Sequence, residues 1–174
     1  MSAIDYDLTR IKGIALDVDG VLSTSTIPLS PEGEPLRMIS TKDGYALQLA
    51  VKKGLQIAVI TGGNTESVRV RFASLGIKEI HLAAAHKLPV MLDWMKRHGL
   101  SADEVAYMGD DIPDLMCMRN VGLPCAPHDA VWEAKETARY ISRFDGGYGC
   151  VRDLVEQILK AQNLWLTDAD SFGW

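Results

Sequence analysis

The chain has 174 residues, a length that suits one domain with a buried core and is short for two. Apolar residues make up 47% and charged residues 24%, as in an ordinary globular protein. The net charge of −5 argues against a nucleic-acid partner, because binding to phosphate backbones needs a positive surface. No apolar run approaches the roughly 20 residues that span a bilayer, and the first residues lack the features of a signal peptide, so no membrane partner is expected.

Short apolar runs alternate with helical patterns along the chain. Strands are predicted at Ile11–Val18, Leu55–Ile60, Glu79–Leu82, Val105–Met108, Val121–Cys125 and Tyr140–Ser142. Helices are predicted at Gly44–Lys53, Thr65–Leu75, Lys87–His98, Ile112–Arg119, Ala130–Glu136 and Cys150–Gln162. This alternation indicates an α/β fold, a mostly parallel sheet flanked by helices in a single domain over residues 1–174.

Two segments depart from this pattern. Residues 22–41 look like two extended stretches around a turn, which predicts a β-hairpin inserted directly after the first strand. Its apolar residues suggest burial, and we expect an intersubunit role for it. The tail, residues 163–174, ends in Phe172-Gly173-Trp174, and we expect it to dock near the site of a neighbouring subunit.

The cysteines are Cys117, Cys125 and Cys150, and no two of them form a C-x-x-C pair. Their odd number and wide spacing favour free thiols in a reducing compartment over a zinc site or a disulfide. A cytoplasmic location is therefore expected.

Polar residues follow the ends of several predicted strands. In parallel α/β sheets, ligands bind beyond the carboxyl ends of the strands, so these residues can converge on one site. They are Asp17 and Asp19 after the first strand, Thr61, Gly62 and Gly63 after the second, Lys87 after the third, and Asp110, Asp111 and Asp114 after the fourth.

So many carboxylates in one place would repel each other unless a cation joined them. All-oxygen ligation beside a phosphate suits Mg²⁺, which neutralises the charge of the incoming phosphate. Thr61 can donate a hydrogen bond to a phosphoryl oxygen and Lys87 can supply a positive charge. Gly62 and Gly63 would let backbone N–H groups approach the same oxygens. The set is coherent for phosphoryl transfer.

The Asp17-x-Asp19 pair can divide the catalytic work. Asp17 can attack phosphorus as a nucleophile and leave a hydrolysable acyl phosphate. Asp19 can protonate the leaving alcohol and later deprotonate water.

Each motif also has a simpler explanation. Asp17 and Asp19 could be turn or capping residues, and Asp110 and Asp111 could merely favour the N-terminal dipole of the next helix. Lys87 could be an ordinary solvated charge near a helix start. No one of these explanations accounts for the residues of all four loops, whereas a single phosphate site does.

The sequence resembles the haloacid dehalogenase superfamily of phosphatases. Asp17-Val18-Asp19-Gly20-Val21, Thr61, Lys87 and Gly109-Asp110-Asp111-x-x-Asp114 match its four motifs in order. The hairpin in place of a cap domain, Lys42-Asp43-Gly44 and the glycine-rich segment 145–152 resemble the narrower family of 3-deoxy-D-manno-octulosonate 8-phosphate phosphatases.

This resemblance implies a Mg²⁺-dependent homotetramer in which neighbouring subunits help to close each site. It implies that Asp17, Asp110 and the backbone carbonyl of Asp19 bind the metal, with Asp111 or Asp114 supporting these ligands. The implied substrate is a phosphorylated sugar acid used for bacterial lipopolysaccharide. Arg71, on the helix after Thr61, is our candidate for contacting the substrate carboxylate.

The substrate itself stays open at this stage. Many relatives carry Arg where this chain has Gly63, and the lead into Lys87 also differs, so these departures concern the sugar end of the site more than the phosphate chemistry. A phosphatase for a nine-carbon sugar-acid phosphate and a promiscuous sugar phosphatase are the nearest alternatives. A phospho-receiver signalling domain also uses an Asp, a Thr and a Lys with Mg²⁺, but it does not need an acid at the position of Asp19.

Overall fold

The computed structural model describes residues 4–174, apart from the side chain of Asp170, and its centre is a six-stranded sheet. All strand pairs are parallel, in the order β3-β2-β1-β4-β5-β6. The predicted strands are therefore confirmed, with ends that shift by a few residues. Their bounds are Gly13–Leu16 (β1), Gln56–Ile60 (β2), Glu79–His81 (β3), Val105–Met108 (β4), Leu123–Ala126 (β5) and Tyr140–Ile141 (β6).

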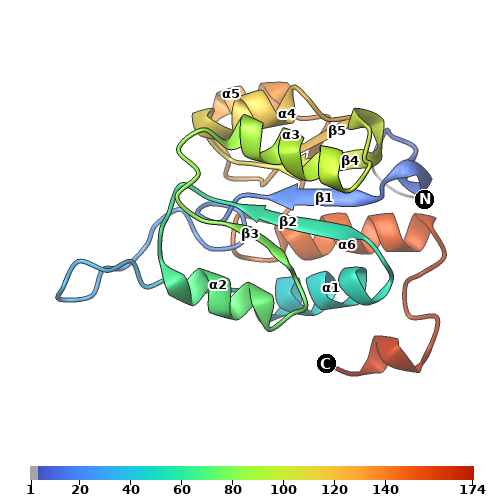
Figure 1. Cartoon of the computed structure of the whole chain (residues 1–174), viewed down its shortest axis with the longest axis horizontal. Coiled ribbons are helices and arrows are strands. Elements are labelled where there is room, and N and C mark those ends of the chain that lie inside the picture. The colour runs from blue at the N-terminus through green and yellow to red at the C-terminus, as the bar shows by residue number, and fades with distance from the viewer. Residues whose placement is uncertain (1–3) are drawn as a thin grey trace.

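Helices cover both faces of the sheet (Figure 1). On one face lie α1 (Thr41–Lys52), α2 (Glu66–Ala73) and α6 (Cys150–Ala161), and on the other lie α3 (Lys87–Arg97), α4 (Leu115–Met118) and α5 (Trp132–Thr137). Short 3₁₀ turns occur at Leu8–Arg10, Ala102–Glu104, Ile112–Asp114 and Ala169–Phe172. The helix predicted at Ile112–Arg119 is divided between one such turn and α4, because Pro113 and the acidic capping residues favour a tight first turn.

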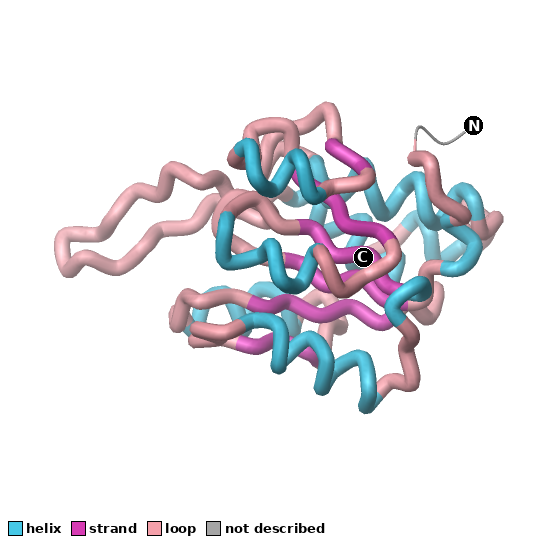
Figure 2. The backbone as a smooth tube through the Cα atoms, turned by 90° about the horizontal axis from the view of Figure 1, so that it is seen from above, coloured by secondary structure: helices cyan, strands magenta, loops and turns pink. Residues whose placement is uncertain are grey.

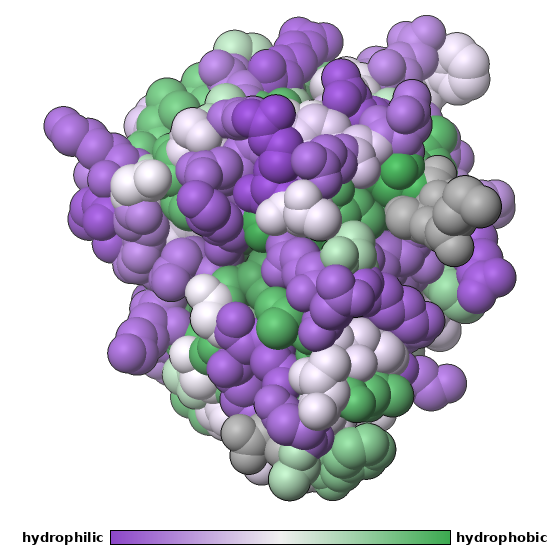
Figure 3. Space-filling view, turned by 90° about the vertical axis from the view of Figure 1, so that its right-hand side faces the viewer, coloured by the Kyte–Doolittle hydropathy of each residue, from purple (hydrophilic) through white to green (hydrophobic). Residues whose placement is uncertain are grey.

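Two apolar clusters fill the layers on either side of the sheet. In β1, Ile14 and Leu16 pack toward α1 and α6, whereas Ala15 packs toward the α3 side. All four residues of β1 and of β4 are buried, as expected for central parallel strands covered on both faces. None of the described helices is both long enough and apolar enough to cross a membrane. Hydrophilic side chains cover most of the face at the amino ends of the strands, with smaller hydrophobic patches between them (Figure 3).

Residues 22–40 form a long arm that extends from the body of the molecule (Figure 2). Its two legs run antiparallel around a turn at Ser30–Gly33 and pair only at isolated bridges, Ser23 with Ile39 and Leu29 with Pro35. The described residues of this arm contain no continuous strand, so the regular hairpin stays a prediction. Most of the arm is exposed, including Leu29, which is 66% accessible.

The tail contacts its own chain, on α1. The Tyr45 hydroxyl donates a hydrogen bond to the carbonyl oxygen of Ser171. The ring of Tyr45 also meets Trp165 and Trp174 edge to face, at centroid distances of 6.1 and 6.2 Å. Edge-to-face packing of aromatic rings stabilises such contacts, and it gives this tail a docking surface within one chain. The expected contact with a neighbouring subunit stays a prediction.

Candidate active site

The candidate site lies where β1 and β4, the two central strands, end side by side. The chain leaves β1 toward α1 on one face and leaves β4 toward α4 on the other (Figure 1). In parallel α/β sheets, ligands bind beyond the carboxyl ends of the strands at such a change of direction. Asp17 follows β1 directly and Asp110 follows β4 after Gly109, so both residues lie at this edge of the sheet.

Asp17 is buried and held by two donors on one oxygen. Its Oδ1 accepts a hydrogen bond from the backbone N–H of Val18 at 2.7 Å and lies 2.8 Å from the ammonium nitrogen of Lys87. Within the described part of the chain, its Oδ2 has no hydrogen-bond partner. The carboxylate is therefore oriented through one oxygen, and the other is left for a ligand.

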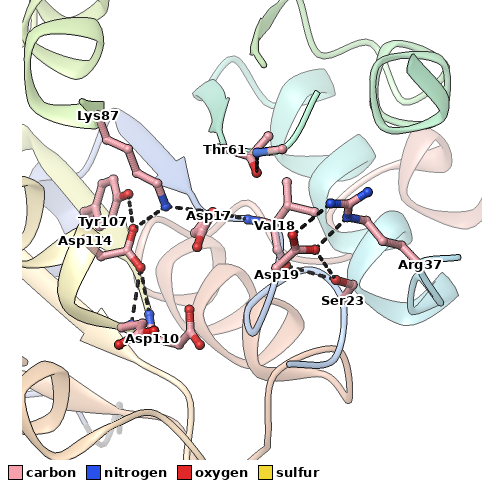
Figure 4. Close-up of polar contacts among 12 residues, drawn as sticks. Asp17, Val18, Asp19, Ser23, Arg37, Thr61, Lys87, Tyr107, Asp110 and Asp114 are labelled. Atoms are coloured by element: carbon pink, nitrogen blue, oxygen red, sulfur yellow. Dashed lines mark hydrogen bonds and ion pairs between the residues drawn. The ribbon is translucent and has the colours of Figure 1, made fainter. Parts of the chain in front are cut away.

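Asp114, which follows β4, contacts the same lysine. The Lys87 ammonium nitrogen lies 2.8 Å from Asp114 Oδ1, and the buried Tyr107 hydroxyl donates to that oxygen at 2.7 Å (Figure 4). The other oxygen of Asp114 accepts the backbone N–H of Asp110 at 3.1 Å. The simple explanation of Lys87 as a solvated charge does not hold, because its side chain is only 6% exposed and bridges two buried carboxylates.

Asp17 and Asp110 have raised pKa values, because each is buried close to other carboxylates. Burial, followed by repulsion from Asp114, raises the pKa of Asp17 to about 7 despite Lys87. Burial and the charges of Asp17 and Asp114 raise the pKa of Asp110 to about 8. Burial alone would lower the pKa of Lys87, but attraction to Asp17 and Asp114 outweighs it and the pKa is raised. The cluster carries more negative charge than one ammonium can balance.

A divalent cation fits this arrangement. One oxygen each of Asp17, Asp110 and Asp114 lie within 4.8 Å of one another. Asp110 Oδ1 is buried without a hydrogen-bond partner among the described residues, a costly state unless another group approaches it. Gly20, at φ +89°, lets the Asp17 loop pass Asp110, because a Cβ there would lie 1.9 Å from Asp110 Oδ2. All-oxygen donors of this kind suit Mg²⁺.

Asp19 lies apart from this cluster, toward the arm (Figure 4). Its two oxygens are 2.6 and 2.8 Å from Nε and Nη2 of Arg37, and Ser23 donates to it at 3.1 Å. Neither Arg37 nor Tyr107 was predicted from the sequence. Arg37 is the one basic residue in segment 22–41, which was a usable signal. Tyr107 gave none, because a tyrosine in a buried strand usually serves packing.

The remaining predicted residues lie at several positions in the loops that follow the strands. Thr61 is buried, and its hydroxyl oxygen accepts the backbone N–H of Gly63 at 3.1 Å. Gly62 is exposed beside it, with open space where a side chain would be. The guanidinium of Arg71 lies against Gly44 at the start of α1.

Asp111 is exposed and accepts the backbone N–H of Ile112 at 2.7 Å. It therefore caps the 3₁₀ turn at Ile112–Asp114 and holds that turn in place, which is part of the simpler explanation considered for this loop.

The comparisons with known proteins agree with this geometry. No protein-family model matches the chain. The chain is 36% identical over 153 residues to 3-deoxy-D-manno-octulosonate 8-phosphate phosphatase of Escherichia coli K12, covering 88% of this chain and 81% of that protein.

Solved structures extend the likeness. The phosphatase of the same name from Moraxella catarrhalis, in complex with a magnesium ion, a phosphate ion and a KDO molecule, is 35% identical, with a TM-score of 0.86 and 90% of each chain covered. The cobalt-bound phosphatase from Haemophilus influenzae is 31% identical, with a TM-score of 0.88, covering 95% of this chain and 98% of that one.

Proposed function

The chain belongs to the 3-deoxy-D-manno-octulosonate 8-phosphate phosphatase family of the haloacid dehalogenase superfamily, and we propose that it hydrolyses the phosphate ester of this sugar acid. The observation that carries the proposal is the oriented, buried carboxylate of Asp17 beside Lys87 at the ends of the central strands. An aspartate so placed can attack phosphorus directly.

In the first step, Asp17 Oδ2 forms a bond to phosphorus while the bond from phosphorus to the leaving alcohol breaks. Lys87 holds the other oxygen of Asp17, which leaves the attacking one free to face the phosphorus. In this proposal, the Thr61 hydroxyl and the backbone N–H of Gly62 donate to the phosphoryl oxygens as charge develops on them. The leaving oxygen takes its proton from Asp19.

In the second step, Asp19 takes a proton from water, and the water oxygen attacks the phosphorus of the acyl phosphate. The bond between phosphorus and Asp17 breaks, which releases inorganic phosphate and restores the carboxylate. Asp19 serves as acid and then as base, so its carboxyl group must be free to face the leaving oxygen.

We assign the Mg²⁺ ligands to Asp17, Asp110 and the backbone carbonyl of Asp19. Asp114 stands beside them and is held by Lys87 and Tyr107, so its role in the proposal is to orient Asp110 and balance charge. When bound, Mg²⁺ supplies positive charge that offsets the repulsion between the phosphate dianion and the nucleophile.

Stability should depend on pH through these acids. The pKa values of Asp17 and Asp110, about 7 and about 8, lie above the ordinary 3.8. The metal-free folded state therefore holds protons that the unfolded chain releases, and this stabilisation, on the order of a few kcal/mol, is lost as the pH rises through these values. Mg²⁺ replaces the protons, so it should raise the melting temperature more at about pH 8.5 than at about pH 5.5.

Thermal melting with and without Mg²⁺ at both pH values checks this prediction. In Asp110→Asn, the extra stabilisation at high pH should disappear. An equal effect of Mg²⁺ at both pH values in the wild type would contradict the assigned cluster.

The substrate is tested by phosphate release. We expect kcat/KM for the eight-carbon sugar-acid phosphate to exceed that for a nine-carbon sugar-acid phosphate and for glucose 6-phosphate, with release lost on chelation of Mg²⁺. A higher value for the nine-carbon compound would reassign the substrate, and equal values would indicate a promiscuous phosphatase.

The proposal extends to assembly and pathway. Leu29, Leu36 and Met38 are more than half exposed on the arm, which favours packing against other copies in a homo-oligomer, and we propose a tetramer. The mass of the particle in solution tests this assembly. A role in lipopolysaccharide precursor synthesis and a cytoplasmic location follow from the proposed substrate, and the three buried free thiols suit a reducing compartment.

A further inference from the structure

Arg37 lies on the arm, most of which is exposed, but its side chain is shielded from solvent. Its side chain is only 7% accessible. Nε and Nη2 form a two-pronged ion pair with Asp19, at 2.6 and 2.8 Å, and Nη1 donates to the Thr65 hydroxyl at 2.9 Å. A guanidinium presents parallel N–H groups that match a carboxylate, so this contact defines a binding position for a carboxylate group.

The backbone around Arg37 leaves room for this contact. A Cβ atom added to Gly63 would lie 2.7 Å from Arg37 Nη2, so a side chain there would displace the guanidinium. Arg37 thus joins the arm to the loops after β1 and β2, on the side of Asp19 away from Asp110 and Asp114 (Figure 4).

The ion pair cannot persist during turnover. Both oxygens of Asp19 are engaged by Arg37, and Ser23 also donates to Oδ1. An Asp19 held in this way has no free oxygen to direct at the leaving group. The pair must open when substrate arrives, and an incoming anion can take the place of Asp19 on the guanidinium.

The position of Arg37 determines which anionic group of the substrate can replace Asp19 on the guanidinium. In the proposed mechanism the phosphoryl group binds at Asp17 and Lys87, so the leaving alcohol extends toward Asp19 and the arm. The part of the substrate that meets Arg37 is therefore the organic part. A planar carboxylate there can reproduce both contacts that Asp19 makes.

We propose that Arg37 binds the carboxylate of the sugar-acid substrate and so selects carboxylated phosphate esters, releasing Asp19 in the exchange. This inference rests on the proposed function. It adds a residue that sets substrate preference, supplied by the arm and distinct from the residues that act on phosphorus.

The test compares Arg37→Met and Arg37→Lys with wild type on the eight-carbon sugar-acid phosphate and on glucose 6-phosphate, which has no carboxylate. Arg37→Met should reduce the ratio of the two kcat/KM values by roughly 10- to 100-fold, mainly through KM for the sugar acid, because a charge-assisted pair is lost. The ratio for Arg37→Lys should lie between those of wild type and Arg37→Met, since lysine keeps the charge but not the two-pronged geometry.

Arg97→Met is the matched control. Arg97 forms a similar two-pronged pair with Glu79, at 2.6 and 2.9 Å, at the end of α3 opposite Lys87. Its removal should leave the substrate ratio unchanged. Melting curves of every variant confirm folding, and Arg37→Lys keeps the test informative if Arg37→Met does not fold.

An equal loss on both substrates in Arg37→Met would overturn the inference, because Arg37 would then act only through Asp19. A wild type that releases phosphate without preferring the carboxylated ester would also overturn it, while leaving the phosphatase activity intact. Failure of wild type and Arg97→Met alike to release phosphate from either ester would instead refute the proposed function on which the inference rests.

Discussion

Asp17→Asn should lose phosphate release by about 10⁴-fold or more, since an amide cannot form the acyl phosphate and removal of a nucleophile commonly costs that much. The substitution also removes a negative charge from a cluster in which carboxylates repel one another. In the absence of metal, the folded variant should therefore be at least as stable as the wild type. Activity and stability should therefore move in opposite directions. Steady-state phosphate release and a melting curve measure the two effects.

Asp93→Asn serves as the control for this substitution. Asp93 is exposed on α3 and pairs with Arg97, so its loss should change neither activity nor stability appreciably. An Asp17→Asn variant that keeps near wild-type turnover would refute the nucleophile. Phosphorylation of wild type without turnover would instead indicate the receiver-like alternative.

Lys87→Met should destabilise the metal-free protein by about 3–5 kcal/mol at neutral to alkaline pH, because it leaves two buried carboxylates without their shared cation. The loss should shrink at low pH, because the pKa of Asp17 is raised to about 7 and its protonated form needs no cationic partner. Catalysis should also fall, by roughly 10²- to 10³-fold, because the attacking carboxylate is no longer held. Chemical denaturation at two pH values and kcat/KM check the prediction.

Lys96→Met is the control for Lys87→Met, because Lys96 is exposed on the same helix. Its removal should change the free energy of unfolding by less than about 0.5 kcal/mol. An equal effect of the two substitutions would mean that Lys87 is an ordinary surface charge.

The fold and the clustering of Asp17, Asp110 and Lys87 were predictable from sequence for a physical reason. Parallel strands buried on both faces leave uninterrupted apolar runs, and the polar residues after them must lie at one edge of the sheet. Asp17, Asp110 and Lys87 follow such runs or open the next helix, and the structure brings them together. Lys87 showed that a lysine at a helix start can be buried when two carboxylates share it.

The features that could not be predicted depend on contacts between segments that are distant in the sequence. Arg37 is 18 residues from Asp19, and only the path of the arm brings them together. In the same way, the tail contacts Tyr45 through Ser171, which is 126 positions away in the sequence. The aromatic residues of the tail alone suggested only a contact with a neighbouring subunit. Arg71 was an attractive candidate from its place on the helix after Thr61, yet its guanidinium lies at Gly44. Helix or strand periodicity contains no information about which distant partner a charged side chain meets.

Chemical trapping of the phosphorylated enzyme tests the central claim most directly. Wild type is mixed with the sugar-acid phosphate and Mg²⁺, treated with borohydride, which reduces an acyl phosphate to an alcohol, and mapped by peptide mass spectrometry. We expect conversion of the side chain at position 17 to an alcohol, only with substrate present. Phosphate release accompanied by trapping at another residue, or by no trapping at position 17, would contradict the account.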